Sequence, residues 1–156
     1  MGTNIEARLA ELGITLPAPA APAANYVPYA VAGGMIYVAG QIPVLDGELK
    51  FTGRLGDGVS IEDGYQAARL CGLNIIAQAK AALDGDLGRV KRVAKLGGFV
   101  NCTADFNDHP KVVNGASDLM VEVFGDSIGQ HARFAVGAPS LPLGVTVEVD
   151  AMIEIG

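Results

Sequence analysis

The stretch SIEDGYQAARLCGLNIIAQAKAAL (residues 60–83) decides the fold, because it is the longest regular segment of the 156-residue chain. Its apolar residues recur at steps of three and four, which places their side chains on one face of an α-helix. Ser60 and Asp63 have the spacing of a capping box, and Asp84-Gly85-Asp86 ends the segment. A helix of roughly six turns is long enough to cover a four-stranded sheet.

Segments typical of β-strands lie on both sides of this helix. Before it, Gly33-Gly34 forms a tight turn between two short strands. After it, apolar residues alternate over three further stretches, the first of which we expect to bend or bulge at Gly97-Gly98. The predicted strands are 29–31, 35–39, 90–102, 132–136 and 145–155, and a second helix is predicted over 112–124. This order predicts an α+β fold, a mixed sheet with two long helices packed on one face.

The N-terminal segment differs from the rest. Thr3 and Glu6 have capping-box spacing and Gly13 is a stop signal, which predicts a short helix over 4–12. Pro17, Pro19 and Pro22 exclude regular helix over residues 16–28, so we expect an extended connector there. We therefore divide the chain into an N-terminal helix and proline-rich arm, residues 1–25, and one domain, residues 26–156.

Composition excludes several classes of function. The formal net charge is -6 and the basic residues are scattered, which disfavours nucleic-acid binding. We find no secretory signal and no apolar run long enough for a membrane span, and Cys71 and Cys102 are predicted to be buried thiols in a cytoplasmic protein. The spacing of His and Cys does not suit zinc, and the phosphate-loop and nucleophile-elbow motifs are missing, so we expect no metal or cofactor.

The last two predicted strands carry the most informative polar residues. In HARFAVG (131–137), alternation separates Arg133 from the apolar Ala132, Phe134 and Val136, which we expect to face the helices. In the final strand the same pattern turns Glu148 and Asp150 away from the helices. The sequence therefore predicts that Arg133, Glu148 and Asp150 share the sheet face opposite the helices.

Two interpretations of this face stay open. An arginine fork matches the two oxygens of a carboxylate, and a nearby glutamate can accept a proton from water, so the face suits a catalytic site. Alternatively, Arg133 forms a salt bridge with Glu148 or Asp150 in an interface between subunits. Glycine and alanine on the predicted strands favour burial against another subunit in both cases.

Three segments together resemble the YjgF/RidA family, also called reactive intermediate deaminase and, in older usage, endoribonuclease L-PSP. They are YVPYAVAGGMIYVAGQIP (26–43), GFVNCTADFNDHPKVVNGA (98–116) and HARFAVGAPSLPLGVTVEVDAMI (131–153). The GQIP turn, the arginine after a small residue and the final LP…VEVDA strand are specific in combination. The resemblance covers about residues 26–155.

The resemblance implies a chorismate-mutase-like fold, assembled as a homotrimer with active sites between subunits. It implies hydrolysis of 2-imino or 2-enamino acids to 2-keto acids and ammonia, without metal or organic cofactor. By position, Arg133 would grip the substrate carboxylate and Glu148 would activate water. The other residues that match the family's pocket are Tyr26, Gly40, Asn114 and Ala135.

This chain also departs from the family pattern. The N-terminal helix and arm have no counterpart in shorter members, and Ala135 stands where many members have cysteine. We therefore expect a longer-chain subgroup whose substrate differs from the simplest imines. Two other functions stay open: a non-catalytic regulator that binds a 2-keto acid, and an endoribonuclease, which the charge balance and the lack of a histidine pair disfavour.

Overall fold

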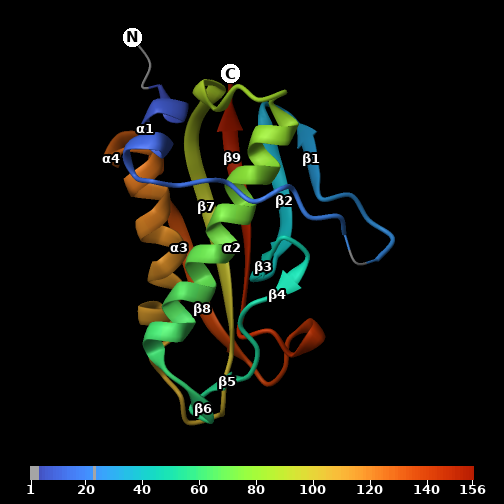
Figure 1. The fold of residues 1–156 in the computed structure, drawn as a ribbon, viewed down its shortest axis with the longest axis vertical. Helices are drawn as coiled ribbons and strands as arrows, with labels where there is room; N and C mark the ends of the chain where they lie inside the picture. Colours follow the sequence, from blue (N-terminus) through green and yellow to red (C-terminus); the bar gives the residue numbers. More distant parts are fainter. Residues whose placement is uncertain (1–3, 23) are drawn as a thin grey trace.

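A five-stranded sheet with two long helices on one face forms the body of the protein. The computed structural model describes residues 4–22 and 24–156. The strand order is β1-β2-β9-β7-β8, in which β7 and β8 are parallel and the other neighbours are antiparallel. Helices α2 and α3 lie side by side over the sheet (Figure 1). This confirms the predicted α+β class.

The helices and strands have the following bounds, and their numbers follow the order of the chain. The helices are α1 (Ile5–Glu11), α2 (Ile61–Ala82), α3 (His109–Phe124) and α4 (Asp126–Gly129), with single 3₁₀ turns at Leu87–Arg89 and Pro142–Gly144. The main strands are β1 (Tyr29–Ala32), β2 (Met35–Gln41), β7 (Val90–Asn101), β8 (Ala132–Ala138) and β9 (Val147–Ile155). Two small pairs are formed by β3 (Val44–Leu45) with β4 (Glu48–Leu49) and by β5 (Arg54–Leu55) with β6 (Gly58–Val59).

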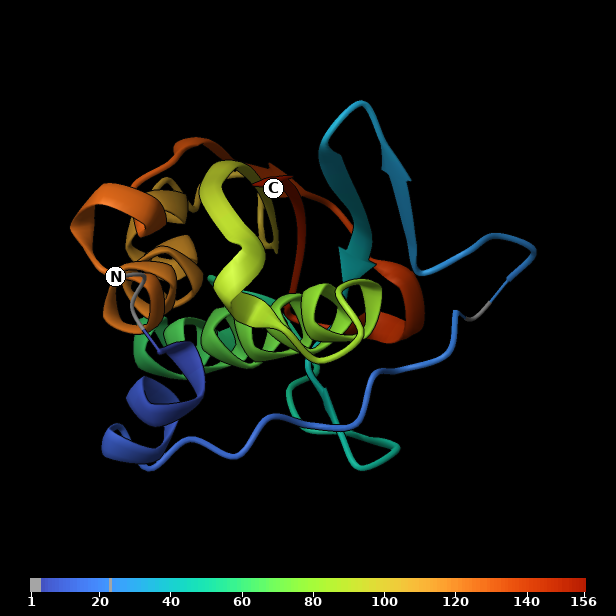
Figure 2. The same cartoon turned by 90° about the horizontal axis from the view of Figure 1, so that it is seen from above.

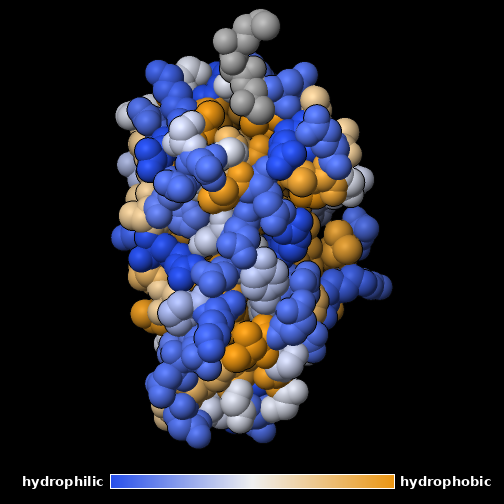
Figure 3. Space-filling model, turned by 90° about the vertical axis from the view of Figure 1, so that its left-hand side faces the viewer, coloured by the Kyte–Doolittle hydropathy of each residue, from blue (hydrophilic) through white to orange (hydrophobic). Residues whose placement is uncertain are grey.

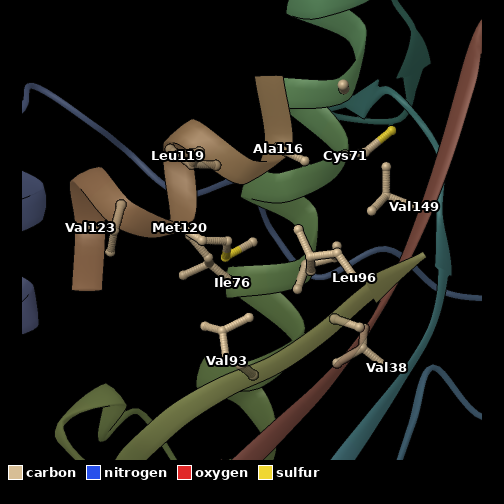
Figure 4. Close-up of a cluster of buried hydrophobic side chains, with 14 of the residues drawn as sticks. Val38, Cys71, Ile76, Val93, Leu96, Ala116, Leu119, Met120, Val123 and Val149 are labelled. Atoms are coloured by element: carbon tan, nitrogen blue, oxygen red, sulfur yellow. The ribbon is translucent and has the colours of Figure 1, made fainter. Parts of the chain in front are cut away.

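The core lies between the helices and the sheet. Figure 4 shows Ile76 of α2 and Met120 of α3 pointing toward Val93 and Leu96 of β7, and all four side chains are fully buried. The two helices approach closely at Gly115, where a Cβ would collide with the backbone oxygen of Tyr65. This close packing fixes α3, and with it the residues that α3 presents to β8.

Local sequence signals account for the helix and hairpin boundaries. The Ser60 hydroxyl accepts from the Asp63 amide at 3.1 Å and caps α2 as predicted. Gly33 and Gly34 both have positive φ in the β1–β2 turn, as predicted. Helix α3 begins at His109, three residues before the predicted start, because Pro110 occupies its first turn, where a proline needs no hydrogen-bonded N–H.

The predicted bulge at Gly97-Gly98 is wrong. The register between β7 and β9 shifts between Val90 and Lys95 instead, and a further irregularity lies between Val38 and Gln41 of β2, opposite β9. The two glycines are needed for space. A Cβ at Gly97 would collide with Asp150 and the Phe134 ring, and one at Gly98 would lie 2.6 Å from Val113 of α3.

The N-terminal segment packs on the helices. Ile5 and Leu9 of α1 are buried, and Arg8 Nε donates to the carbonyl oxygen of Glu122 in α3 at 2.8 Å. Asn4 caps α1 by accepting from the Ala7 amide; the predicted cap, Thr3, lies outside the described residues. The arm then crosses α2 toward β1 without regular secondary structure (Figures 1 and 2).

Candidate functional site

A cavity of about 750 Å³ lies between the proline-rich arm, the start of β9 and the segment that follows β2. Tyr26, Gly40 and Glu148 line it, so the structure brings together three of the six predicted site residues. Arg133, Asn114 and Ala135 do not line this cavity. The predicted site is therefore divided into two groups within one chain, which we call the acid half-site (Tyr26, Gly40, Glu148) and the arginine half-site (Arg133, Asn114, Ala135).

The acid half-site depends on a close approach between Gly40 and Glu148. A Cβ at position 40 would lie 2.6 Å from Glu148 Oε2, so only glycine leaves the carboxylate in its present place. Gly40 lies in the irregular part of β2, where Val38 pairs with Ala151 and Gln41 with Val149. Irregularities of this kind commonly re-aim a strand beside a functional group.

Burial raises the pKa of Glu148 above its ordinary value, and the neighbouring Asp150 carboxylate raises it further. The pKa of Asp150 is also raised, chiefly by burial. Two carboxyl groups with raised pKa values on one strand hold protons more readily than free carboxylates do. Glu148 is therefore a stronger base than a free carboxylate and is suited to accept a proton from water.

In the arginine half-site, α3 fixes the guanidinium of Arg133. Arg133 Nη1 donates to Asn114 Oδ1 at 2.9 Å and to Ser117 Oγ at 3.1 Å. Within residues 4–22 and 24–156, Arg133 forms no ion pair. Desolvation lowers its pKa, and the charge of Asp118 only partly opposes that effect. The guanidinium is thus held in place by neutral groups, which leaves its charge available to an anion.

His131 supports this arrangement through Ser117. Its Nδ1 lies 2.7 Å from the Gly129 carbonyl oxygen and its Nε2 lies 2.8 Å from Ser117 Oγ. A carbonyl only accepts, so the neutral ring carries its hydrogen on Nδ1, and Nε2 accepts from the Ser117 hydroxyl. The hydroxyl oxygen then faces Arg133 as an acceptor.

The prediction that Arg133 shares a sheet face with Glu148 is wrong. Arg133 contacts α3 and therefore lies on the helix side, whereas Glu148 alternates with the buried Val147 and Val149 and lies on the open face. Phe134, predicted to face the helices, is on the open face, where its ring packs edge-to-face on Phe99 at 5.3 Å. Within one chain Arg133 therefore forms no salt bridge with Glu148 or Asp150, and the pairing across an interface between subunits stays a prediction.

The open face of the sheet carries exposed apolar side chains from four strands. They are Tyr37, Phe99, Val136 and Met152, each between 38% and 43% exposed. By contrast, the side of the molecule that carries α1, α3 and α4 is mostly hydrophilic (Figure 3). An apolar patch that spans a whole sheet face is typical of a surface that contacts another protein.

Several residues that shape the site were not predicted. Ser117 and His131 hold Arg133, and Asn74 and Gln78 of α2 hold the walls of the cavity. Asn74 and Gln78 are polar residues of a long helix, yet they are only 2% and 1% exposed. Gln66 is exposed and marks the solvent face of α2. At 100° per residue, Asn74 lies about 80° and Gln78 about 120° around the helix axis from Gln66, so a helical wheel could have separated both residues from the solvent face.

Two classes of site lack support in the part of the chain that the structure describes. No three His, Cys, Asp or Glu side chains come together there in a group that could hold a metal ion. None of the helices in the same residues has the length and apolar character needed to cross a bilayer.

Similar proteins match this chain over most of their length. Protein TCP17 of Trypanosoma cruzi is 50% identical over 152 residues, which are 97% of this chain and 94% of the relative. The crystal structure of Atu1372 from Agrobacterium tumefaciens, described as of unknown function, is 48% identical with a TM-score of 0.89 and covers 97% of this chain and 94% of its own. A "putative endoribonuclease" from Shewanella oneidensis is 39% identical with a TM-score of 0.93, over 98% of this chain and 100% of its own.

The sequence model of one family, described as "YjgF/chorismate mutase-like, putative endoribonuclease", matches residues 6–155. That range includes both half-sites and the arm. The chain therefore belongs to the YjgF/chorismate mutase-like family.

Proposed function

We propose that the protein is a hydrolytic deaminase of 2-imino and 2-enamino acids, and that each active site is completed by two copies of the chain. The observation that carries this proposal is the division of the site. The acid half-site has a carboxylate but no cation among its lining residues, and the arginine half-site has an anchored cation without an ion-pair partner in the described chain. A substrate with both a carboxylate and a hydrolysable C=N bond needs the two together.

The chemistry follows from the two groups. Arg133 of one copy binds the substrate carboxylate through its free N–H groups. Glu148 of a second copy accepts a proton from water, and the oxygen of that water forms a bond to the imine carbon. Glu148 returns that proton to the nitrogen of the resulting tetrahedral adduct and then carries the hydroxyl proton of the adduct to the same nitrogen, so that the C–N bond breaks and ammonia leaves as the C=O bond of the 2-keto acid forms. Atoms and electrons balance without a redox partner.

The open face supplies a surface on which copies can meet. Tyr37, Phe99, Val136 and Met152 expose apolar area there that water hydrates poorly, and the family resemblance implies a homotrimer. A trimer has three equivalent interfaces, which would create three sites. Sedimentation at micromolar concentration is expected to give three chains per particle.

Turnover can be measured directly with imines made in situ by an amino-acid oxidase. The protein should accelerate the appearance of 2-keto acid and ammonia over the spontaneous rate, and semicarbazide should trap less imine. Binding of a 2-keto acid without any acceleration would instead identify the regulator alternative. Cleavage of single-stranded RNA that survives Glu148→Gln would support an endoribonuclease and contradict the proposal.

A further inference from the structure

The cavity beside Glu148 is larger than hydrolysis of a small imine requires, and most of its lining is apolar. One side is the arm, residues 18–22, and other walls come from the β3–β4 hairpin and from Pro142 and Leu143. The hairpin contributes Val44 and Leu49. A three-carbon imino acid would leave most of the 750 Å³ filled with water.

The polar groups in the lining are largely occupied by the protein itself. Asn74 Nδ2 donates to the carbonyl oxygens of Ile42 and Val44, at 3.1 and 2.9 Å, and Gln41 Nε2 donates to the Ala39 oxygen at 2.9 Å. These side chains fix the walls and have few donors left for a ligand. Most of the surface presented to a ligand is therefore apolar.

The charges in the lining have one sign. Asp46 and Glu148 are the carboxylates in the lining, and none of the described residues that line the cavity is a lysine, arginine or histidine. An acidic group that entered the cavity would meet like charge and would find no cation. The carboxylate of a substrate must therefore stay outside, and the mostly apolar walls favour an apolar group over a charged one.

The arm is held against α2 by a buried polar contact. Gln78 Nε2 donates to the carbonyl oxygen of Ala20 at 2.9 Å, and the Gln78 side chain is 1% exposed. Figures 1 and 2 show the arm crossing α2 on its way to β1. Gln78 thus positions one wall of the cavity from the core of the domain.

We propose that this cavity binds the side chain of the substrate, and that the preferred substrates are 2-imino acids with an uncharged, apolar side chain of four or more carbon atoms. The inference rests on the proposed deaminase function. The arm and the hairpin enclose the side chain, while the carboxylate points out to Arg133 of the neighbouring copy. Each methylene that leaves water for an apolar wall adds about three- to fourfold to affinity.

The first test compares imines made from alanine, norvaline, norleucine, methionine and glutamate. We expect kcat/KM to rise at least tenfold from alanine to norleucine, and to fall at least tenfold from methionine to glutamate, which has a similar length but carries a charge. Equal values for alanine and norleucine, or a preference for glutamate, would overturn the proposal.

Binding separates this inference from the function on which it rests. The straight-chain 2-keto acids of three to six carbons can be titrated calorimetrically without any turnover. Affinity that rises with chain length supports the cavity assignment even if no imine is hydrolysed, and in that case only the deaminase proposal fails. Affinity independent of chain length refutes the cavity assignment.

Two variants locate the effect in the walls. Val44→Phe fills the cavity and should lower kcat/KM for norleucine imine at least tenfold, while alanine imine changes less than twofold. Gln78→Leu removes the hydrogen bond that holds the arm and should reduce the ratio of kcat/KM for norleucine imine to that for alanine imine. Gln66→Leu, a change of the same kind on the exposed face of α2, is the control and should leave the preference unchanged. An equal loss for both substrates in Val44→Phe would contradict the inference.

Discussion

Arg133 and Glu148 lie on opposite faces of the same five-stranded sheet. Arg133 is anchored to Asn114 and Ser117 of α3, and Glu148 lies against Gly40 on the open side. One chain cannot apply both groups to one small molecule. Both groups can reach one substrate if β8, the edge strand that carries Arg133, meets the open face of a second copy, which carries Glu148.

The sharpest prediction is complementation between inactive variants. Arg133→Ala should lower kcat/KM roughly 30- to 1000-fold, because a charge-assisted contact is lost, and Glu148→Gln should lower kcat about 10²- to 10⁴-fold. Trimers mixed at random from equal amounts of the two variants should recover about one quarter of wild-type activity, since a quarter of the sites receive both native groups. Co-expression with two affinity tags measures this. No recovery in verified mixed trimers would show that the site does not span two copies.

The acid limb of the pH profile should report Glu148. The pKa of Glu148 is raised, so when the pH is lowered this base becomes protonated earlier than a free glutamate would. As a result kcat/KM should begin to fall at a pH above the ordinary pKa of glutamate. Asp150→Asn removes a like charge, which stabilises ionised Glu148 and lowers its pKa, so the limb should move to lower pH. Glu154→Gln, farther along β9, is the control. A shift to higher pH in Asp150→Asn would contradict this assignment.

Gly40→Ala should separate activity from folding. The new methyl group would meet the flexible end of Glu148, which can move, so the melting temperature should change by only a few degrees. The displaced carboxylate would no longer be aligned with the water, and kcat should fall about 10- to 100-fold. The control is Ala39→Gly, which changes a neighbouring residue of β2. Gly47→Ala is unsuitable as a control because Gly47 has a positive φ, which would strain an alanine. Unchanged kcat would show that the position of Glu148 does not matter.

Ser117 should act by positioning Arg133. Ser117→Ala removes one of the two acceptors of Nη1, so KM should rise about 3- to 10-fold while kcat changes little. Ser117→Thr keeps the hydroxyl and should restore most of the loss. Ser127→Ala, on the exposed helix α4, is the control for a serine-to-alanine change. A loss in kcat with unchanged KM would assign Ser117 another role.

Elements built from local signals could be predicted from the sequence. The Ser60 cap and the Gly33-Gly34 turn each depend on a few neighbouring residues, and both occur where the sequence predicts them. The family resemblance also held, because its motifs lie within single strands and turns. Three of the six predicted site residues, Tyr26, Gly40 and Glu148, line one cavity.

The faces of β8 could not be predicted, and the reason is physical. Alternation reveals which side of a strand is apolar, but in this sheet both sides carry apolar residues. The helix side buries them in the core, and the open face exposes residues such as Phe99 and Val136. Phe134 therefore gave no indication of where the helices lie. The link between Arg133 and Ser117 depends on how α3 packs on β8, which no spacing within either element encodes.

The arm at residues 18–22 has a consequence for the evolution of the protein. These residues contribute nothing to the buried apolar core, and they touch it through the Gln78 side chain. Substitutions there can accumulate with little loss of stability, because Gln78 binds a backbone oxygen that every residue type supplies and the arm side chains lie at the surface. Lineages could then acquire new substrate ranges by altering a few arm residues, while the catalytic groups and the fold stay constant.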